Sequence, residues 1–130
     1  MATTVDEMLA EARAKLKRLD PRAASEAMAD GAVLVDIRSY PQRAADGVVP
    51  GSIHIHRNVL EWRCDPRSDY RDERVSDRSV RVVLMCNEGY QSSLAAAVLQ
   101  DLGVERATDV DGGFQAWRAA GLPVEPAPSG

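Results

Sequence analysis

The chain has 130 residues, of which 45% are hydrophobic and 28% charged, the balance of a soluble globular domain with one core. Its formal net charge of −4 gives no electrostatic basis for binding nucleic acid or an anionic membrane. The longest apolar runs, 82–86 and 94–99, are too short to span a bilayer. Acidic Asp6 and Glu7 stand where an export signal carries basic residues, so we expect a cytoplasmic protein whose two cysteines remain thiols.

Apolar residues recur at three- and four-residue intervals over 5–19, which is typical of an amphipathic helix, with Thr4 as its N-cap. We expect this helix to pack on the flank of the domain. Asp20–Pro21 begins a second helix and Asp30–Gly31 ends it, because Asp caps a helix and Pro is tolerated in its first turn. The expected parts of the chain are an N-terminal helical extension, one domain and a flexible tail: residues 1–16, 17–124 and 125–130.

Three later runs are short, apolar and rich in β-branched residues, as in strands that are covered on both faces. Helical stretches alternate with them, and this alternation predicts an α/β fold with a mostly parallel sheet. In such sheets ligands bind beyond the carboxyl ends of the strands, where the sequence places Asp36, Arg38 and Cys86. The predicted strands are 33–37, 80–86 and 107–110, and the predicted helices are 59–64, 92–102 and 113–120.

Cys86 ends one of these strands and is followed by a short loop that contains Gly89 and then by a helix. The N–H groups of such a loop and the positive end of the helix both favour a thiolate. The same donors can hold an extra anionic sulfur or a developing oxyanion above the thiol. The alternative interpretation is a structural cysteine at the end of a strand, because Cys is among the most buried residue types.

Four segments of the chain resemble, in the same order, the motifs of the single-domain rhodaneses, which are sulfurtransferase homology domains. They are LVDIR at 34–38, GVVPGSI at 47–53, the Cys86 loop with Ser92, and DGGFQAW at 111–117. The resemblance implies a three-layer rhodanese-like fold with a mostly parallel five-stranded sheet flanked by helices. It also implies that Cys86 is the catalytic nucleophile and that the following loop binds the substrate: Asn87, Glu88, Gly89, Tyr90, Gln91 and Ser92.

In this family a donor such as thiosulfate loads a sulfane sulfur onto the cysteine, and a thiophilic acceptor such as cyanide or another thiol removes it. The resemblance therefore implies a small sulfur donor or a persulfide-donor protein, a thiol acceptor, and no cofactor beyond the covalent persulfide on Cys86. Asp36 and Arg38 are expected to support the site as an internal ion pair. Ser92 or Ser93 is expected to cap the following helix and to donate to the persulfide.

The loop departs from the family pattern in its charge. Family loops often carry cations, whereas this loop has Asn87, Glu88 and Gln91 and is therefore acidic. A carboxylate beside an anionic donor costs about 1 kcal/mol or more at short range. We therefore expect weak turnover of thiosulfate and a preference for a neutral or cationic donor, or for a protein persulfide. Val48, where the family commonly has His, is expected to be structural.

In the rhodaneses the chain passes over the mouth of the site after the second strand. Residues 57–66, which follow a presumed strand after Pro50–Gly51, occupy this place in the sequence. Arg57, Trp62 and Arg63 then either form a pocket wall that shapes acceptor access, or are a core tryptophan and two solvated arginines. Cys64 is either a resolving thiol for the persulfide or a small residue that fills the core.

Three other functions are weighed against sulfur transfer. A phosphatase of the same fold needs an Arg six residues after its cysteine to clamp the phosphoryl oxygens, and that position is Ser92. A zinc site would have to combine His54 and His56, on one face of a strand, with the cysteines; this spacing matches no finger or ribbon, so we expect no metal. A non-catalytic binding module is favoured by the acidic loop and disfavoured by the intact Cys86.

Overall fold

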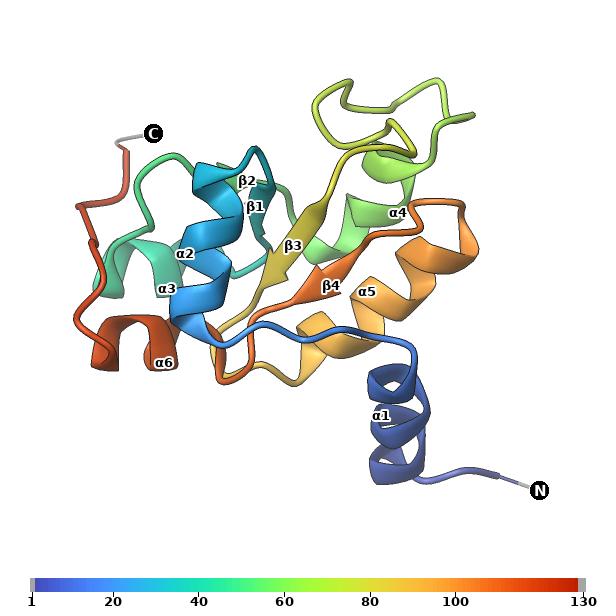
Figure 1. The fold of residues 1–130 in the computed structure, drawn as a ribbon, viewed down its shortest axis with the longest axis horizontal. Helices are drawn as coiled ribbons and strands as arrows, with labels where there is room; N and C mark the ends of the chain where they lie inside the picture. Colours follow the sequence, from blue (N-terminus) through green and yellow to red (C-terminus); the bar gives the residue numbers. More distant parts are fainter. Residues whose placement is uncertain (1, 129–130) are drawn as a thin grey trace.

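The computed structural model of the protein describes residues 2–128 and shows a parallel sheet between two layers of helices (Figure 1). Its strands are β1 (Val33–Asp36), β2 (Ile53–His54), β3 (Val82–Met85) and β4 (Thr108–Asp109), arranged in the order β2-β1-β3-β4. The pairings are parallel, and β1 and β3 form the centre of the sheet. The structure confirms the predicted α/β class and parallel sheet.

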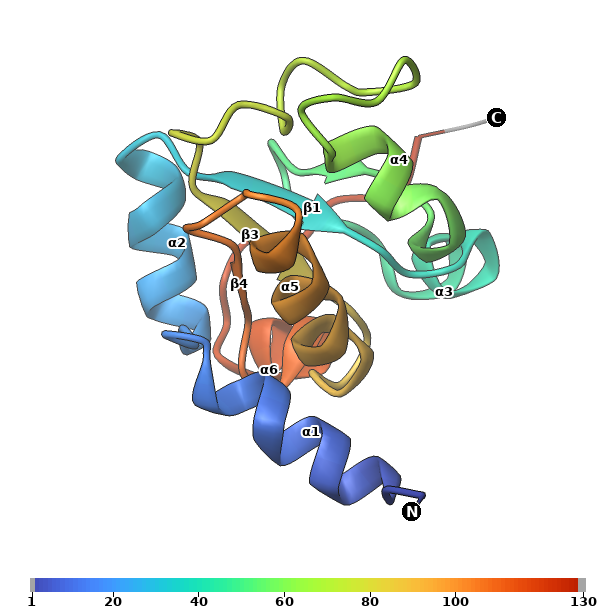
Figure 2. The same cartoon turned by 90° about the vertical axis from the view of Figure 1, so that its right-hand side faces the viewer.

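Alternate residues of the buried strands point to opposite faces of the sheet, and helices cover each face (Figure 2). Val35 and Leu84 belong to the half of the core that packs under α4 and α5. Leu34 and Val83 belong to the other half, which packs under α2 and α6. These helices are α2 (Pro21–Ala29), α4 (Leu60–Cys64), α5 (Gln91–Asp101) and α6 (Gly113–Ala119).

Within residues 2–128 the sheet has four strands, where the rhodanese resemblance implied five. The fifth position is reduced to one residue, Leu19, which forms a parallel bridge with Val110 beside β4. The Leu19 N–H donates to the Asp109 carbonyl at 3.0 Å, and the Asp111 N–H donates to the Leu19 carbonyl at 2.8 Å. A longer strand does not form because the chain enters α2 two residues later, at Pro21, which has no N–H to pair.

The N-terminal helix, α1 (Val5–Ala14), is shorter than the apolar pattern predicts, and it packs against α5. It begins at a capping box in which the Thr4 hydroxyl accepts from the Glu7 N–H and the Glu7 carboxylate accepts from the Thr4 N–H. Leu16 and Leu19 continue the apolar pattern beyond the helix. They leave the helix and pack against the two halves of the core, because this stretch of backbone runs alongside β4.

The sequence pattern does not predict two short elements, α3 (Tyr40–Asp46) after β1 and the 3-10 helix η1 (Arg57–Val59) before α4. α3 begins with a capping box between Ser39 and Gln42 and has a proline in its first turn, so a start signal is present in the sequence. Its seven residues bury no side chain fully, and a helix this short and exposed has no clear apolar period.

Two segments outside the sheet are held by specific contacts. Val48 and Glu125 exchange backbone hydrogen bonds of 2.7 and 2.8 Å. Glu125 is the first residue of the expected flexible tail, so the tail is bonded to the domain where it begins. Residues 129–130, at the end of the expected tail, lie outside the described part. The connection 65–81 between α4 and β3 has no helix or strand, and Asp72 within it is nearly buried.

No helix among residues 2–128 is long and apolar enough to cross a membrane.

Candidate active site

Cys86 directly follows β3 and begins the loop that leads into α5. Only 6% of the residue is exposed. Its Sγ accepts hydrogen bonds from the backbone N–H groups of Gly89 and Ser92, at 3.2 and 3.4 Å, and the thiol donates to the Ser92 hydroxyl at 3.3 Å. Two backbone amides therefore donate to the sulfur, an arrangement that stabilises a negative charge on it.

Glycine lets this loop approach the first turn of α6. Gly89 has a φ of +86°, and a Cβ at this position would lie 2.7 Å from the Gly112 nitrogen. From the same turn of α6, the Phe114 N–H donates to the Cys86 carbonyl at 2.9 Å. The start of α6 thus holds the backbone on one side of the loop while the amides of the loop contact the sulfur.

The thiol lines a small cavity with a volume of about 240 Å³. A second cavity of about 500 Å³ adjoins it, shares Arg38, Gln42 and Gln91 with it, and is also lined by Arg57. The predicted loop residues line the first cavity, apart from Gly89 and Ser92, which contact the sulfur directly. The residues around the first cavity are Arg38, Gln42, Cys86, Asn87, Glu88, Tyr90 and Gln91.

Asp36 and Arg38 form a buried ion pair at the end of β1, with nitrogen-to-oxygen distances of 3.0 and 2.8 Å. Arg38 also donates to the Gly47 carbonyl at 2.8 Å, and its guanidinium carbon lies 3.8 Å from the centroid of the Phe114 ring. Arg43 adds a second ion pair to Asp36 at 3.2 Å. Within residues 2–128, Nη1 of Arg38 is buried without a hydrogen-bond partner, so this charged side chain has one uncommitted donor group beside the cavities.

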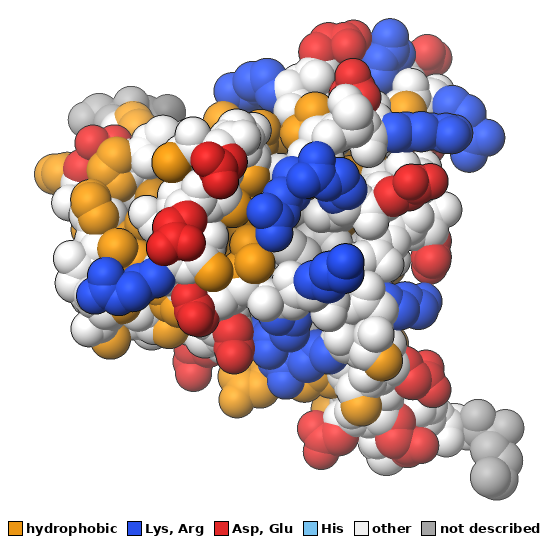
Figure 3. All heavy atoms as spheres, viewed as in Figure 1, with side chains coloured by type: hydrophobic (Ala, Val, Ile, Leu, Met, Phe, Trp, Pro, Cys, Tyr) orange, Lys and Arg blue, Asp and Glu red, His pale blue; other side chains and the backbone are white. Residues whose placement is uncertain are grey.

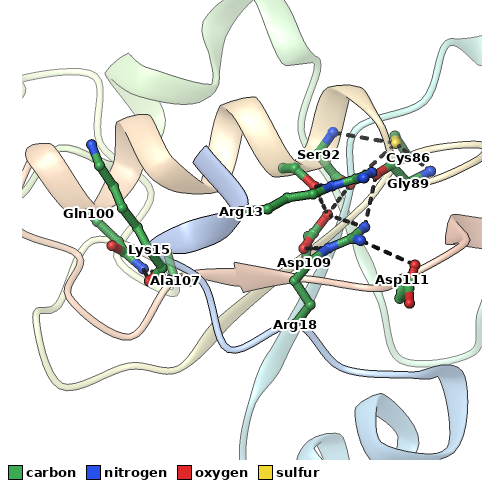
Figure 4. A network of polar contacts seen from close by, with 11 residues as sticks. Arg13, Lys15, Arg18, Cys86, Gly89, Ser92, Gln100, Ala107, Asp109 and Asp111 are labelled. Atoms are coloured by element: carbon green, nitrogen blue, oxygen red, sulfur yellow. Dashed lines mark hydrogen bonds and ion pairs between the residues drawn. The ribbon is translucent and has the colours of Figure 1, made fainter. Parts of the chain in front are cut away.

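A second buried carboxylate, Asp109 in β4, is linked to the sulfur through a serine (Figure 4). Its Oδ2 accepts hydrogen bonds from the hydroxyl groups of Ser92 and Ser93, each at 2.7 Å. The guanidinium group of Arg18 donates to both carboxylate oxygens, at 2.9 and 3.2 Å. The predicted helix cap is wrong: the N-cap of α5 is Tyr90 and makes no side-chain capping bond, because both serines are bonded to Asp109.

Two arginines from the N-terminal segment, residues 2–19, reach the same loop (Figure 4). The Gly89 carbonyl accepts hydrogen bonds from Nη2 of Arg13 at 2.8 Å and from Nη2 of Arg18 at 2.9 Å. Arg13 also donates to the Ser93 hydroxyl at 3.1 Å. Burial lowers the pKa of Arg18, but the hydrogen bond and charge of Asp109, together with further negative charges nearby, raise it above its ordinary value. Arg18 therefore stays charged.

Sequence reasoning did not find Arg13, Arg18 or Asp109. Asp109 offered a signal, because an acidic residue inside the apolar run 107–110 must find a partner when that run is buried. The arginines offered no comparable signal, since 76 and 71 residues separate them from Gly89 along the chain.

The three residues proposed for a pocket wall lie in different places. Arg57 pairs with Glu61 at 2.8 Å and lines the second cavity. Trp62 is 58% exposed and lines a separate surface hollow, so in the described structure it is neither a core residue nor a wall of the Cys86 cavity. Arg63 pairs with Asp72 at 3.4 Å and so holds the connection 65–81 rather than the site.

Cys64 is completely buried in the half of the core under α4 and α5. Burial, followed by the charges of Asp72 and Glu61, raises the pKa of this thiol to about 12. Leu60 and Cys64 form the buried face of α4, and Trp62, midway between them, is therefore exposed. The environment of Cys64 is that of a residue that fills the core.

His54 and His56 lie on one face, with their ring centroids 4.9 Å apart. Both pack edge-on against Tyr40 at the start of α3. Nε2 of His54 is hydrogen-bonded to the Arg38 carbonyl at 2.8 Å, and burial lowers the pKa of His54. The two histidines thus belong to an aromatic cluster that packs α3 against the end of β2.

Comparison with known proteins places this architecture in a family. The family model of the rhodanese-like domain matches residues 20–120. The chain is 35% identical over 105 residues to thiosulfate sulfurtransferase GlpE of Ectopseudomonas mendocina (strain ymp), covering 81% of this chain and 87% of that relative. It is 34% identical over 113 residues to the GlpE protein of Pseudomonas fluorescens (strain Pf-5), covering 87% and 94%.

Two solved structures share the fold of this chain. A protein of unknown function from Rhodopseudomonas palustris CGA009, described as a possible tyrosine phosphatase, is 34% identical with a TM-score of 0.88, covering 96% of both chains. Thiosulfate sulfurtransferase from Pseudomonas aeruginosa is 26% identical with a TM-score of 0.67, covering 88% of this chain and 20% of that chain. The chain therefore belongs to the rhodanese-like domain family.

Proposed function

We propose that the protein is a rhodanese-type sulfurtransferase, or persulfide carrier, in which Cys86 accepts a sulfane sulfur and passes it on. The observation that carries the proposal is the position of the thiol, which lines a cavity while its Sγ accepts backbone hydrogen bonds from Gly89 and Ser92. A cysteine that only fills the core needs neither feature. The names of the GlpE relatives support the same chemistry.

The reaction has two displacement steps at sulfur. First, the Cys86 thiolate attacks the terminal sulfur of a donor R–S⁻; a new S–S bond forms, the R–S bond breaks, and R leaves with the electron pair, as sulfite from thiosulfate or as a thiolate from a persulfide. An acceptor thiolate then attacks the outer sulfur of the Cys86 persulfide, and the Cys86 thiolate leaves. Each step exchanges one nucleophile for another, so the covalent persulfide is the only carrier that the reaction requires.

The residues around the thiol have distinct roles in these steps. The amides of Gly89 and Ser92 stabilise negative charge on the Cys86 sulfur, both when it attacks and when it leaves. The cavity of about 240 Å³ suits a small sulfur donor or the end of a protein persulfide, with a thiol as acceptor. Exposed Glu88 at the cavity disfavours thiosulfate relative to a neutral donor, while buried Arg38 adds a positive charge to the lining.

Phosphate chemistry fits the site less well. The position that a phosphatase of this fold needs as an Arg is Ser92, which is completely buried and bonded to the Asp109 carboxylate. Ser92 carries no charge that could clamp the phosphoryl oxygens, and Glu88 at the cavity repels a phosphate dianion. The description of the Rhodopseudomonas palustris neighbour is therefore not extended to this chain.

Whole-protein mass spectrometry after incubation with thiosulfate, and separately with sodium polysulfide, tests the proposal. The wild type and Cys64→Ser should each gain the mass of one sulfur atom, and Cys86→Ser should gain none. If the wild type gains no sulfur from either donor, the protein is a binding module instead of a carrier. Hydrolysis of para-nitrophenyl phosphate that is lost in Cys86→Ser would establish a phosphatase in its place.

A further inference from the structure

The family match begins at residue 20, yet Arg13 and Arg18 precede it and contact the active-site loop. Figure 4 shows both guanidinium groups directed at the Gly89 carbonyl. Both side chains are partly buried, so their hydrogen bonds are shielded from water more than those of surface arginines. Among the hydrogen bonds of residues 2–128, neither guanidinium is bonded to the Cys86 sulfur. Besides the Coulomb attraction between Arg18 and Cys86, the arginines act on the sulfur through the groups between them.

The first of these groups is the loop backbone. Because the carbonyl and the N–H of a trans peptide point in opposite directions, holding the Gly89 carbonyl toward two arginines turns the Tyr90 N–H away from them. Charge-assisted hydrogen bonds are about twice as strong as neutral ones. The arginines therefore hold the peptide unit that directly follows Gly89, and the N–H of Gly89, in the preceding unit, donates to the sulfur at 3.2 Å.

The second group is the Ser92 hydroxyl. While Cys86 is a thiol, Ser92 accepts from the thiol and donates to Asp109. Once the thiol has lost its proton to solvent, a lone pair of Ser92 faces a negatively charged sulfur at 3.3 Å. Rotation about the Cβ–Oγ bond of Ser92 turns its proton to the sulfur and removes one hydrogen bond from Asp109. Arg18 and Ser93 still bond that carboxylate, so the rotation leaves no unpaired buried charge.

We propose that Arg18, with Arg13 as a second contact, is a positioning residue for the sulfur-transfer reaction. It neutralises Asp109, which lets Ser92 turn its proton to the Cys86 thiolate, and it holds the Gly89 carbonyl, which keeps the loop amide at the sulfur. The N-terminal segment thereby supplies the cations that the loop itself lacks. This inference rests on the proposed function for the reaction that it serves, but thiolate reactivity can be measured without any sulfur transfer.

The matched control is Lys17→Gln, which removes the same charge from the same segment. Lys17 lines a separate cavity of about 380 Å³ together with Arg81 and Arg106. Figure 3, drawn in the same view as Figure 1, shows Lys and Arg side chains that gather near the centre of the molecule, over β4. A general effect of net charge would change the reactivity of Cys86 in both variants, whereas a loss of loop positioning would change it in Arg18→Gln alone.

The experiment uses the full chain and measures the rate at which neutral iodoacetamide alkylates Cys86 near neutral pH, followed by the rate of sulfur loading from polysulfide. Arg18→Gln should slow both rates about tenfold, and Arg13→Gln should slow them less, because it leaves Asp109 paired. Lys17→Gln should react like the wild type. Thermal unfolding of each variant shows that it is folded.

A double variant separates positioning from a general structural role. If Arg18 acts by neutralising Asp109, then adding Asp109→Asn to Arg18→Gln removes the unpaired charge and restores part of the alkylation rate; a merely structural role predicts a further loss. Alkylation of Arg18→Gln at the wild-type rate, or a double variant slower than Arg18→Gln, would overturn the inference. If Arg18→Gln does not fold, wild-type rates in Arg13→Gln overturn it instead. Failure of the wild type to load sulfur contradicts the proposed function and leaves the alkylation test intact.

Discussion

The Gly113 backbone lies directly against the Cys86 carbonyl: a Cβ at position 113 would stand 2.5 Å from that oxygen. Gly113 also has a φ of +62°, a conformation that a side chain disfavours by about 1 kcal/mol. We expect Gly113→Ala to lower the free energy of unfolding by about 3 kcal/mol or more, because the packed backbone must also move. Urea denaturation measures this loss.

Gly121→Ala is the matched control for this substitution. Gly121 has a similar φ of +74°, but nothing lies within 4 Å of its added Cβ. Gly121→Ala should therefore lower the free energy of unfolding by only about 1 kcal/mol. Equal losses in the two variants would show that the Cys86 carbonyl does not restrict position 113.

Ser92 and Ser93 form a second pair for comparison, because each donates to Asp109 at 2.7 Å, whereas Ser92 also contacts the Cys86 sulfur and Ser93 accepts from Arg13. Replacing either serine by Ala should lower the free energy of unfolding by about 1.5–3 kcal/mol. Ser92→Ala should in addition slow sulfur transfer to cyanide about tenfold, since the thiolate loses a donor. A loss of rate in Ser93→Ala as large as that in Ser92→Ala would contradict this role.

The two thiols should differ in reactivity in the native protein. Burial raises the pKa of Cys64 to about 12, so this thiol stays protonated and shielded at neutral pH. We expect iodoacetamide to label Cys86 alone in the native chain, and Cys64 only after unfolding. Peptide mass spectrometry identifies the labelled residue. A disulfide between the two cysteines after treatment with peroxide would show instead that Cys64 is a resolving thiol.

Glu88 should set the preference among donors. Its exposed carboxylate lines the cavity with Cys86 and repels thiosulfate. We expect Glu88→Ala to raise kcat/KM for thiosulfate about fivefold and to leave transfer from a neutral donor unchanged. Glu105→Ala, which removes an exposed carboxylate at a different cavity, is the control. Efficient thiosulfate turnover by the wild type with no gain in Glu88→Ala would refute this expectation.

Asp72 should make the stability of the fold depend on pH in the acid range. Hydrogen bonds from Arg74, at 3.0 and 2.7 Å, lower the pKa of Asp72 from 3.8 to about 2. A carboxyl group with a lower pKa in the folded state stabilises the fold above its unfolded pKa, and this contribution is lost as the pH falls through the folded value. Because Arg74 is largely exposed, we expect Asp72→Asn to lower the free energy of unfolding by only about 1 kcal/mol at neutral pH.

The difference in the free energy of unfolding between Asp72→Asn and the wild type should disappear as the pH falls from about 4 to about 2. Urea denaturation across this range would show it. Asp69→Asn removes an exposed carboxylate from the same segment, and it should change the free energy of unfolding much less than Asp72→Asn does. A difference for Asp72→Asn that persists at the acid end would mean that the ion pair with Arg74 does not lower the pKa of Asp72.

The sequence by itself determined the features that are continuous along the chain. The alternation of apolar runs with helical stretches predicted the α/β fold and the parallel sheet, because the period of apolar residues reports local structure. The Cys86 loop was predictable for the same reason, since the strand, Gly89 and the helix that contains Ser92 follow one another directly. The ion pair between Asp36 and Arg38 was expected from the resemblance to the rhodaneses and not from the period of apolar residues.

Only the tertiary structure decided which distant residues complete the site. Arg18 lies 91 residues from Asp109 and 71 from Gly89, and their hydrogen bonds exist because the N-terminal segment runs along the edge of β4. The exposure of Trp62 and the departure of Leu19 from its expected helix likewise depend on which face of each element meets the core. Apolar periodicity shows that an element has a buried face, but the partner of that face is set by packing between elements, which no local pattern encodes.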